Sequence, residues 1–200
     1  MNQIEAFLEY LLLERKYSKH TITAYRNDLI SFRDFCEVEY DQESIVSVNY
    51  SQIRSWIVSL VDNEITNRSI NRKVSSLKTF YKFLQKTKQI QINPLAGHNA
   101  LKTSKEVQVP FSVKEVNNAI SKIITDDSFE ALRDKLIVEL FYSTGMRRAE
   151  LIHLKISSID FSGGMVKVLG KRNKERFIPL LQSVVTVSYT HLTLPTIYSV

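Results

Sequence analysis

Cysteine is almost absent from this sequence, in which Cys36 is the one thiol among 200 residues. A single thiol cannot close an internal disulfide, and with four scattered histidines it offers no zinc-ligand spacing. Glycine is also scarce, and the five glycines form no glycine-rich phosphate loop. We therefore predict a protein without a metal site and without a cofactor.

Long apolar runs are missing as well. No run approaches the roughly 20 apolar residues that cross a bilayer, and the opening stretch MNQIEAFLEY carries no basic segment ahead of an apolar one. We expect a cytoplasmic protein with no membrane partner.

The composition that is present is that of a globular protein, with 44% hydrophobic and 24% charged residues. The length allows one or two domains, each with its own core. The formal net charge of +6 favours a polyanionic partner, although many basic proteins bind no nucleic acid.

The first half of the chain has the apolar period of amphipathic helices. Apolar side chains recur three and four residues apart in four segments, which are residues 4–12, 22–36, 53–61 and 70–84. Ser18 is the expected N-cap of the second helix. Four such helices can enclose one core, so we predict a helical domain over residues 1–92. Polar residues interrupted by Pro94 and Pro110 predict a linker over residues 93–110.

The second half begins with helices. A Ser-x-x-Glu capping box at Ser112 and Glu115 opens one predicted helix, and another apolar helix runs to a Ser-Thr-Gly turn at residues 143–145. A short helix can restart at Arg147, so the stretch STGMRRAEL is predicted to form a helix-turn-helix corner.

Short β-prone runs follow the corner. They are SSIDF, MVKVL and RFIPL, separated by Ser-Gly-Gly and by GKRNKE, as expected of an antiparallel three-stranded sheet. Lys171 would lie at the tip of the second hairpin. The predicted fold is therefore mainly α with a small antiparallel β-sheet, in which residues 111–182 form part of an α+β domain.

The last stretch, residues 183–200, contains four threonines and no Lys, Arg, Asp or Glu. A β-prone, uncharged end of this kind would be an aggregation hazard without charged gatekeepers. We interpret it as an anomalous tail that is foreign to the fold.

Basic residues gather in the fourth predicted helix, where residues 65–88 contain seven Lys and Arg and no acid. Four of these basic residues form a stripe with Ser75 and Thr79, at steps of three and four and on the side away from the apolar face: Arg68, Arg72, Ser75, Thr79, Lys82 and Lys86. A solvated surface is the simplest interpretation of such a stripe. The lack of acids favours contact with phosphates instead.

A second basic concentration lies between residues 143 and 176, with eight basic residues against three acids. A polymer such as DNA can touch two domains across a linker, whereas a small anion needs only one. The simplest interpretations are that Arg147 pairs with Glu150 or with solvent, and that Lys171 is a flexible hairpin lysine. Alternatively, Arg147 can present its planar fork to a phosphate, and Lys171 can give a proton to a leaving oxygen.

In the order and sequence of its motifs, the chain resembles the tyrosine recombinase (phage integrase) family, and most closely its Xer-like bacterial members. The segments that carry the resemblance are YSKHTITAYRNDLISF, INRKVSSLKTFYKFL, INPL, ELFYSTGMRRAELIHLKISSID and VKVLGKRNKERFIPL. The resemblance implies a helical, SAM-like core-binding domain and a catalytic domain that close around double-stranded DNA.

The same resemblance implies roles for individual residues. Arg147 would be the first catalytic arginine, which binds the non-bridging oxygens of the scissile phosphate, and Lys171 would protonate the departing 5′ hydroxyl. Glu150 would orient the corner, and Arg148 would be a backbone contact or a surface charge. The expected DNA-binding residues are Lys19, Thr21, Tyr25, Arg68, Arg72, Lys73, Thr79, Lys82 and Arg172.

In this family a tyrosine attacks the phosphodiester and forms a 3′-phosphotyrosyl link, with no metal and no ATP. The resemblance also implies tetramers on two duplexes, with a paralogous recombinase as a candidate partner. Xer-like members typically resolve chromosome dimers.

The remaining catalytic residues of the family, a His-x-x-Arg pair, a later His or Trp and the nucleophilic tyrosine, are not identified in this chain. Tyr189 follows Arg147 by only 42 residues (189 − 147), so we assign no catalytic role to Tyr189, His191 or Tyr198. We expect an incomplete copy that binds DNA and cleaves none. Two other interpretations stay open, a non-catalytic DNA-binding protein or regulator, and a helical module whose basic face meets an acidic protein.

Overall fold

The computed structural model describes residues 3–105, 107–123, 128–170, 174–181, 184 and 185. The chain divides into two compact units, Met1–Val107 and Gln108–Val200, and each has its own hydrophobic core. The point of division lies inside residues 93–110, the range predicted as a linker.

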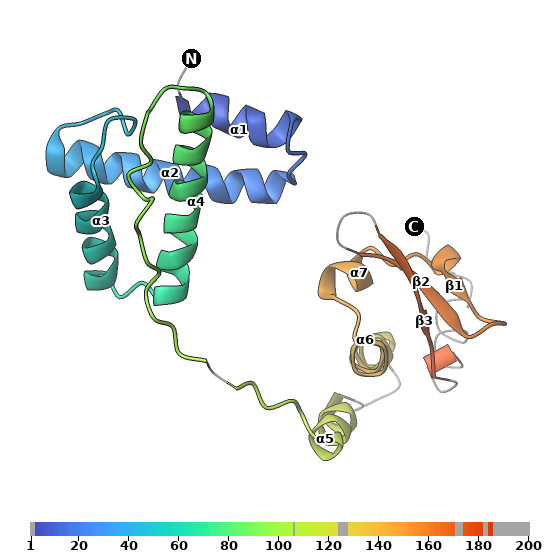
Figure 1. Cartoon of the computed structure of the whole chain (residues 1–200). Coiled ribbons are helices and arrows are strands. Elements are labelled where there is room, and N and C mark those ends of the chain that lie inside the picture. Colours follow the sequence, from blue (N-terminus) through green and yellow to red (C-terminus); the bar gives the residue numbers. More distant parts are fainter. Residues whose placement is uncertain (1–2, 106, 124–127, 171–173, 182–183, 186–200) are drawn as a thin grey trace. The chain divides into compact units, whose positions relative to one another are not determined.

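The described residues of unit 1 form four helices (Figure 1). They are α1 (Gln3–Leu13), α2 (Lys19–Tyr40), α3 (Tyr50–Asp62) and α4 (Asn67–Lys86). Polar N-caps open three of them, because Ser18, Asn49 and Thr66 each accept a hydrogen bond from the backbone N–H three residues further on. The N-cap predicted at Ser18 is confirmed.

The core of unit 1 takes at least one large aromatic ring from each helix. Phe7, Phe32, Trp56 and Phe80 are all buried, with ring centroids 5.4 Å apart for Phe7 and Phe80 and 5.0 Å apart for Phe32 and Trp56. Rings of this size dominate the energetics of a small core. Cys36 lies in the same core, where burial raises the pKa of its thiol to about 11 and keeps it protonated at neutral pH.

The chain after α4 stays on unit 1 before it continues to unit 2. Leu95 is fully buried, and Asn71 of α4 exchanges two hydrogen bonds with the backbone of Leu101. Asn71 Nδ2 donates to Leu101 O over 2.9 Å, and Asn71 Oδ1 accepts from Leu101 N over 2.8 Å. The first half of the predicted linker, residues 93–102, therefore lies along α4 (Figure 1).

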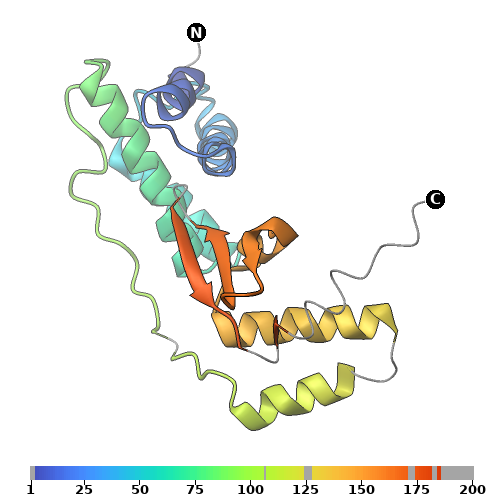
Figure 2. The same ribbon diagram turned by 90° about the vertical axis from the view of Figure 1, so that its right-hand side faces the viewer.

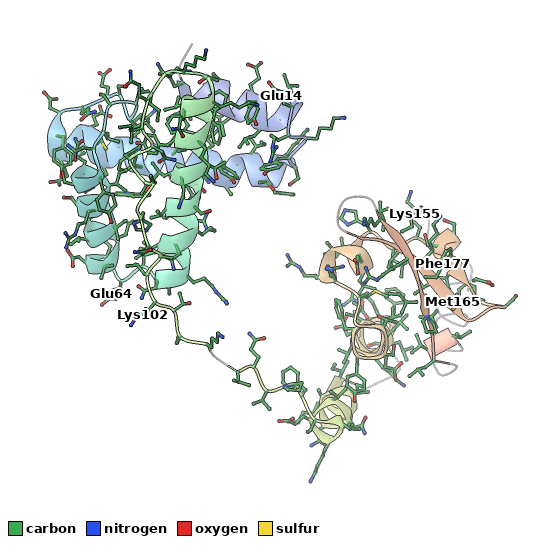
Figure 3. The ribbon with its side chains drawn as sticks, viewed as in Figure 1. Glu14, Glu64, Lys102, Lys155, Met165 and Phe177 are labelled. Carbon is green, nitrogen blue, oxygen red and sulfur yellow. The ribbon has the colours of Figure 1, made fainter. Side chains whose placement is uncertain are left out.

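This packed segment ends where α4 begins. Asn67 Nδ2 donates to the carbonyl oxygen of Lys102 over 2.8 Å. Figure 3 labels Lys102 at this end of the segment, and Glu64 in the turn between α3 and α4. The segment thus follows α4 back to its N-terminal end.

Unit 2 combines helices with a sheet. Its described elements are α5 (Val113–Ile123), α6 (Phe129–Thr144), α7 (Arg148–Ile152), the 3-10 turn η1 (Ile156–Ser158), β1 (Ile159–Asp160), β2 (Met165–Leu169) and β3 (Glu175–Pro179). The capping box predicted at Ser112 and Glu115 is confirmed, since Ser112 N donates to Glu115 Oε2 and Glu115 N donates to Ser112 Oγ. Helices α5 and α6 lie side by side, and the sheet lies on the other side of α6 (Figure 2).

The described strands form a sheet in the order β1-β2-β3, with antiparallel neighbours. Val166 and Val168 of β2 are buried against Leu136 and Leu140 of α6, while the alternate residue Lys167 is exposed. This alternation is expected of a sheet with one face on a core and the other in water. The predicted fold class, mainly α with a small antiparallel β-sheet, is confirmed.

Candidate nucleic-acid interface

The basic stripe of α4 lies away from the side that the helix buries. Arg68, Ser75 and Lys82 are exposed. Thr79 is half-buried, and its hydroxyl donates to Ser75 O over 2.8 Å, as hydroxyls often do inside helices. Arg68 and Lys82 are therefore the cations of the stripe for which the structure describes no ion pair, hydrogen bond or ring contact. Their charges are available for a phosphate.

A buried carboxylate lies beneath the same helix. Asp28 of α2 is 1% exposed, and its Oδ2 accepts hydrogen bonds from Arg72 Nη1 over 2.5 Å and from Ser76 Oγ over 2.7 Å. Lys73 Nζ lies 3.5 Å from Asp28 Oδ1. A buried carboxylate needs such partners, so Arg72 and Lys73 are tied to the fold of unit 1. Over half of the Arg72 side chain still reaches solvent, whereas Lys73 is mostly covered.

Asp28 was not predicted from the sequence. The signal available for it was an acid within the apolar face of α2, directly before the buried Leu29. Acids are rarely found at such positions without a cationic partner.

The residues predicted at the start of α2 have different environments. Lys19 is exposed. Thr21 Oγ1 lies 2.9 Å from Ser18 Oγ within the helix cap, and the Tyr25 ring centroid lies 5.8 Å from that of Phe7. Lys19 can therefore meet a phosphate directly, while Thr21 and Tyr25 also help to build the unit.

In unit 2, local hydrogen bonds fix the turn that precedes Arg147. Gly145 ends α6 in the left-handed region at φ 59°, which glycine adopts without a Cβ penalty. Thr144 Oγ1 donates to Leu140 O over 2.5 Å and accepts from Met146 N over 3.2 Å, and Met146 is buried in the core. Arg147 follows as the N-cap residue of α7.

Glu150 joins this corner to strand β3. Its side chain is 3% exposed, and Arg176 donates to both carboxylate oxygens, from Nη1 to Oε1 over 2.7 Å and from Nη2 to Oε2 over 2.8 Å. Arg147 donates to the same carboxylate from its backbone N to Oε2 and from Nη1 to Oε1, both over 2.8 Å. The Arg176 guanidinium, followed by the Arg147 backbone N–H, lowers the pKa of Glu150 to about 2. Glu150 is therefore an anion throughout the physiological pH range.

Arg147 combines a fixed position with an exposed charge. It is paired with Glu150, yet 64% of its side chain is exposed. A guanidinium that is anchored at one nitrogen and exposed at the others suits bidentate contact with a phosphate. Arg176, the other arginine on Glu150, was not predicted, because its contact with Glu150 joins residues 26 positions apart in the sequence.

Lys171 and Arg172 lie outside the described residues. The hairpin that carries them is closed at its base, where Gly170 N donates to Lys174 O over 2.7 Å. Tyr189, His191 and Tyr198 also lie outside the described residues. Where the structure does describe the chain, no group of His, Cys, Asp and Glu could hold a metal ion, and no helix has the length and apolar character to cross a membrane.

Comparison with known families gives one match for each unit. Residues 4–88 match the family described as phage integrase, N-terminal SAM-like domain, and residues 113–193 match the phage integrase family. The first match spans the four helices of unit 1, and the second spans the Arg147 corner and the hairpin. The chain belongs to the phage integrase family of tyrosine recombinases.

Within this family the chain is similar to tyrosine recombinase XerC of Staphylococcus aureus strain MSSA476, with 39% identity over 181 residues. The aligned part is 90% of this chain and 59% of that relative. The chain thus spans less than two thirds of the length of the curated relatives that it matches.

Solved structures share the fold. The Tn1549 transposon integrase in complex with transposon right end DNA aligns with a TM-score of 0.72 and 21% identity, over 95% of this chain and 64% of that one. A lambda integrase tetramer bound to a Holliday junction aligns with a TM-score of 0.70 and 18% identity, over 92% of this chain and 52% of that one.

Proposed function

We propose that the chain binds double-stranded DNA and serves site-specific recombination by the tyrosine recombinase reaction. The observation that carries the proposal is the corner of unit 2, where Arg147 keeps an exposed guanidinium anchored on the buried Glu150 in a chain of this family. The α4 stripe supports the proposal, because exposed cations on a helix without acids suit a phosphate backbone.

In this reaction a tyrosine hydroxyl attacks the phosphorus of one phosphodiester, the 5′ oxygen leaves and a 3′-phosphotyrosyl link forms. A second 5′ hydroxyl then reverses the step and joins new partners. Arg147 binds the non-bridging oxygens and stabilises the negative charge that grows on them. Lys171 gives a proton to the leaving 5′ oxygen, and Arg172 contacts the backbone.

The recombining assembly in this proposal holds four protomers on two duplexes in the cytoplasm, with a paralogous recombinase as a candidate partner. A lambda integrase tetramer bound to a Holliday junction has the same fold, which supports such an arrangement. The 200 residues themselves bind DNA without cleaving it. They contain no His-x-x-Arg sequence, and Tyr189 follows Arg147 by only 42 residues (189 − 147).

DNA binding is tested by fluorescence anisotropy with a labelled duplex at several salt concentrations. Replacing Arg68 and Lys82 by Ala removes two exposed cations of α4, which should reduce the salt slope of log K by about two. Arg72 is left in place because its loss would strip Asp28 of a partner.

The matched control for this experiment removes the same charge from other helices, by Arg33→Ala on α2 with Arg54→Ala on α3. The control should change the slope less, because these residues lie outside the stripe. Equal changes in the two double variants would mean that the stripe is only a solvated surface.

Cleavage is tested separately with a nicked suicide duplex that traps covalent complexes. We expect no protein–DNA adduct from the 200-residue chain. An adduct that Tyr189→Phe abolishes would show that the nucleophile is present after all.

A further inference from the structure

The cluster at Glu150 holds two guanidinium groups against one carboxylate. Glu150 accepts four hydrogen bonds, two from Arg147 and two from Arg176. In the part of unit 2 that the structure describes, no second carboxylate pairs with either arginine. The cluster therefore keeps a net positive charge.

The two arginines use the carboxylate differently. Arg176 places both Nη groups on it as a fork, whereas the side chain of Arg147 donates one hydrogen bond and its other bond comes from the backbone N–H. A guanidinium carries five N–H donors, so most donors of Arg147 remain for another acceptor. The Arg147 side chain is also the more exposed, at 64% against 39% for Arg176.

The hairpin that carries Lys171 begins against this cluster. A Cβ placed on Gly170 would lie 3.2 Å from Arg176 Nη1 and 3.4 Å from Glu150 Oε1. Arg176 itself pairs with Val168 across strands β2 and β3. One arginine thus contacts the corner, through Glu150, and the start of the hairpin connection.

We propose that Arg176 is a positioning residue, which occupies Glu150 and so keeps the Arg147 guanidinium available for a phosphate of DNA. The inference rests on the proposed function. Without Arg176, both oxygens of Glu150 turn to Arg147, and a bidentate carboxylate–guanidinium pair forms. That pair neutralises the cation that a phosphate needs. Arg176 acts through Glu150 and does not touch the DNA.

The test is a mutant cycle on the 200-residue chain, read as duplex binding against salt concentration. Arg176→Ala should weaken binding about tenfold and reduce the salt slope by about one, as Arg147→Ala does. Adding Glu150→Gln to Arg176→Ala removes the carboxylate that captures Arg147, so binding should recover to within about threefold of the wild type. If Arg176 only stabilised the fold, the double variant would bind the duplex more weakly than either single variant.

Arg133→Ala is the matched control, because Arg133 pairs over 2.8 Å with Asp134 in the same unit and both side chains are about half exposed. The inference is overturned if Arg176→Ala weakens binding no more than Arg133→Ala, or if the double variant gains nothing over Arg176→Ala. If Arg147→Ala itself changes nothing, the proposed role of Arg147 fails together with the inference. The response of the Arg147→Ala variant therefore distinguishes a failure of the inference alone from a failure of the proposed function.

A second measurement distinguishes unfolding of a variant from displacement of the Arg147 guanidinium. It is the NMR signal of the Arg147 Nε–H group. In Arg176→Ala this signal should shift and exchange more slowly with water, and in the double variant it should return toward the wild-type position. Arg176→Lys keeps a cation without the fork, so its binding and its signal should be intermediate. An Arg147 signal that stays unchanged in both Arg176 variants also overturns the inference.

Discussion

Two buried carboxylates each hold an arginine whose side chain still reaches solvent. Asp28 holds Arg72 in unit 1, and Glu150 holds Arg147 in unit 2. In each case more than half of the arginine side chain reaches solvent. An arginine that is already fixed loses less entropy when it meets a phosphate. An acid within a basic surface can therefore favour DNA binding, although its charge alone opposes it.

Asp28→Ala should lower the free energy of unfolding by about 1–3 kcal/mol, because the Ser76 hydroxyl and the Lys73 ammonium lose a buried partner. Urea unfolding followed by circular dichroism measures the change. Asp34→Ala is the control on the same helix, where the exposed pair with Arg33 should contribute less than about 1 kcal/mol. Similar losses in the two variants would show that Asp28 has no special structural role.

The lowered pKa of Glu150 predicts how the stability of unit 2 depends on pH. A carboxyl whose pKa is about 2 in the folded protein, against 4.5 ordinarily, stabilises the fold fully above pH 4.5 and loses this contribution as pH falls toward 2. Over this range Glu150→Gln should melt at a temperature that depends less on pH. Glu115→Gln is the matched comparison, because hydrogen bonds from Ser112 also lower the pKa of Glu115, but Glu115 is exposed and its replacement should flatten the pH dependence less. Equal slopes for wild type and Glu150→Gln would refute the prediction.

At the scale of elements, the helices and strands could be predicted because their signals are local. Ser18 and the Ser112–Glu115 box mark helix starts within four residues of sequence, and the apolar period follows from side chains on one face. The packing of residues 93–102 has no such signal. Leu95 is a single buried leucine without a period, and the Asn71–Leu101 contact joins residues 30 positions apart.

Asn71→Ala should loosen the chain around Leu101 on α4, because both hydrogen bonds to Leu101 are lost. The cost should be about 1–2 kcal/mol, measured as faster hydrogen exchange of the Leu101 amide. Asn99→Ala is the control, since Asn99 is exposed on the same segment. Unchanged exchange at Leu101 would mean that the burial of Leu95 and the Asn67–Lys102 hydrogen bond hold the segment without Asn71.

At the scale of the whole molecule, the connection between the units is the stretch most open to proteolysis among the residues that the structure describes. Val107, Val109 and Phe111 are each more than 80% exposed. Within residues 3–181, chymotrypsin should therefore cut first after Phe111, as mass spectrometry of the fragments would show. Phe129 is exposed but helical and should be cut later. A first cut within residues 3–92 would contradict the division into two domains.

The site itself was predictable where it follows from a short motif. Arg147 stands out because a Thr-Gly turn and a helix start surround it in sequence. Asp28 and Arg176 were not predictable, because each acts on a residue that only folding brings near. Lys171 stays a prediction, since it lies outside the described residues.

The burial of Leu95 has a consequence for anyone who isolates unit 1 of the protein. The family match for unit 1 ends at residue 88, and the domain predicted from sequence ends at residue 92. A fragment cut at either point loses Leu95, whose backbone N–H is also held by Asn93 Oδ1 over 2.8 Å. The empty space left in the core would cost about 2–5 kcal/mol and invite aggregation. A fragment extended to residue 105 keeps Leu95 in the core. A stably folded fragment of this domain must therefore be longer than the four helices alone.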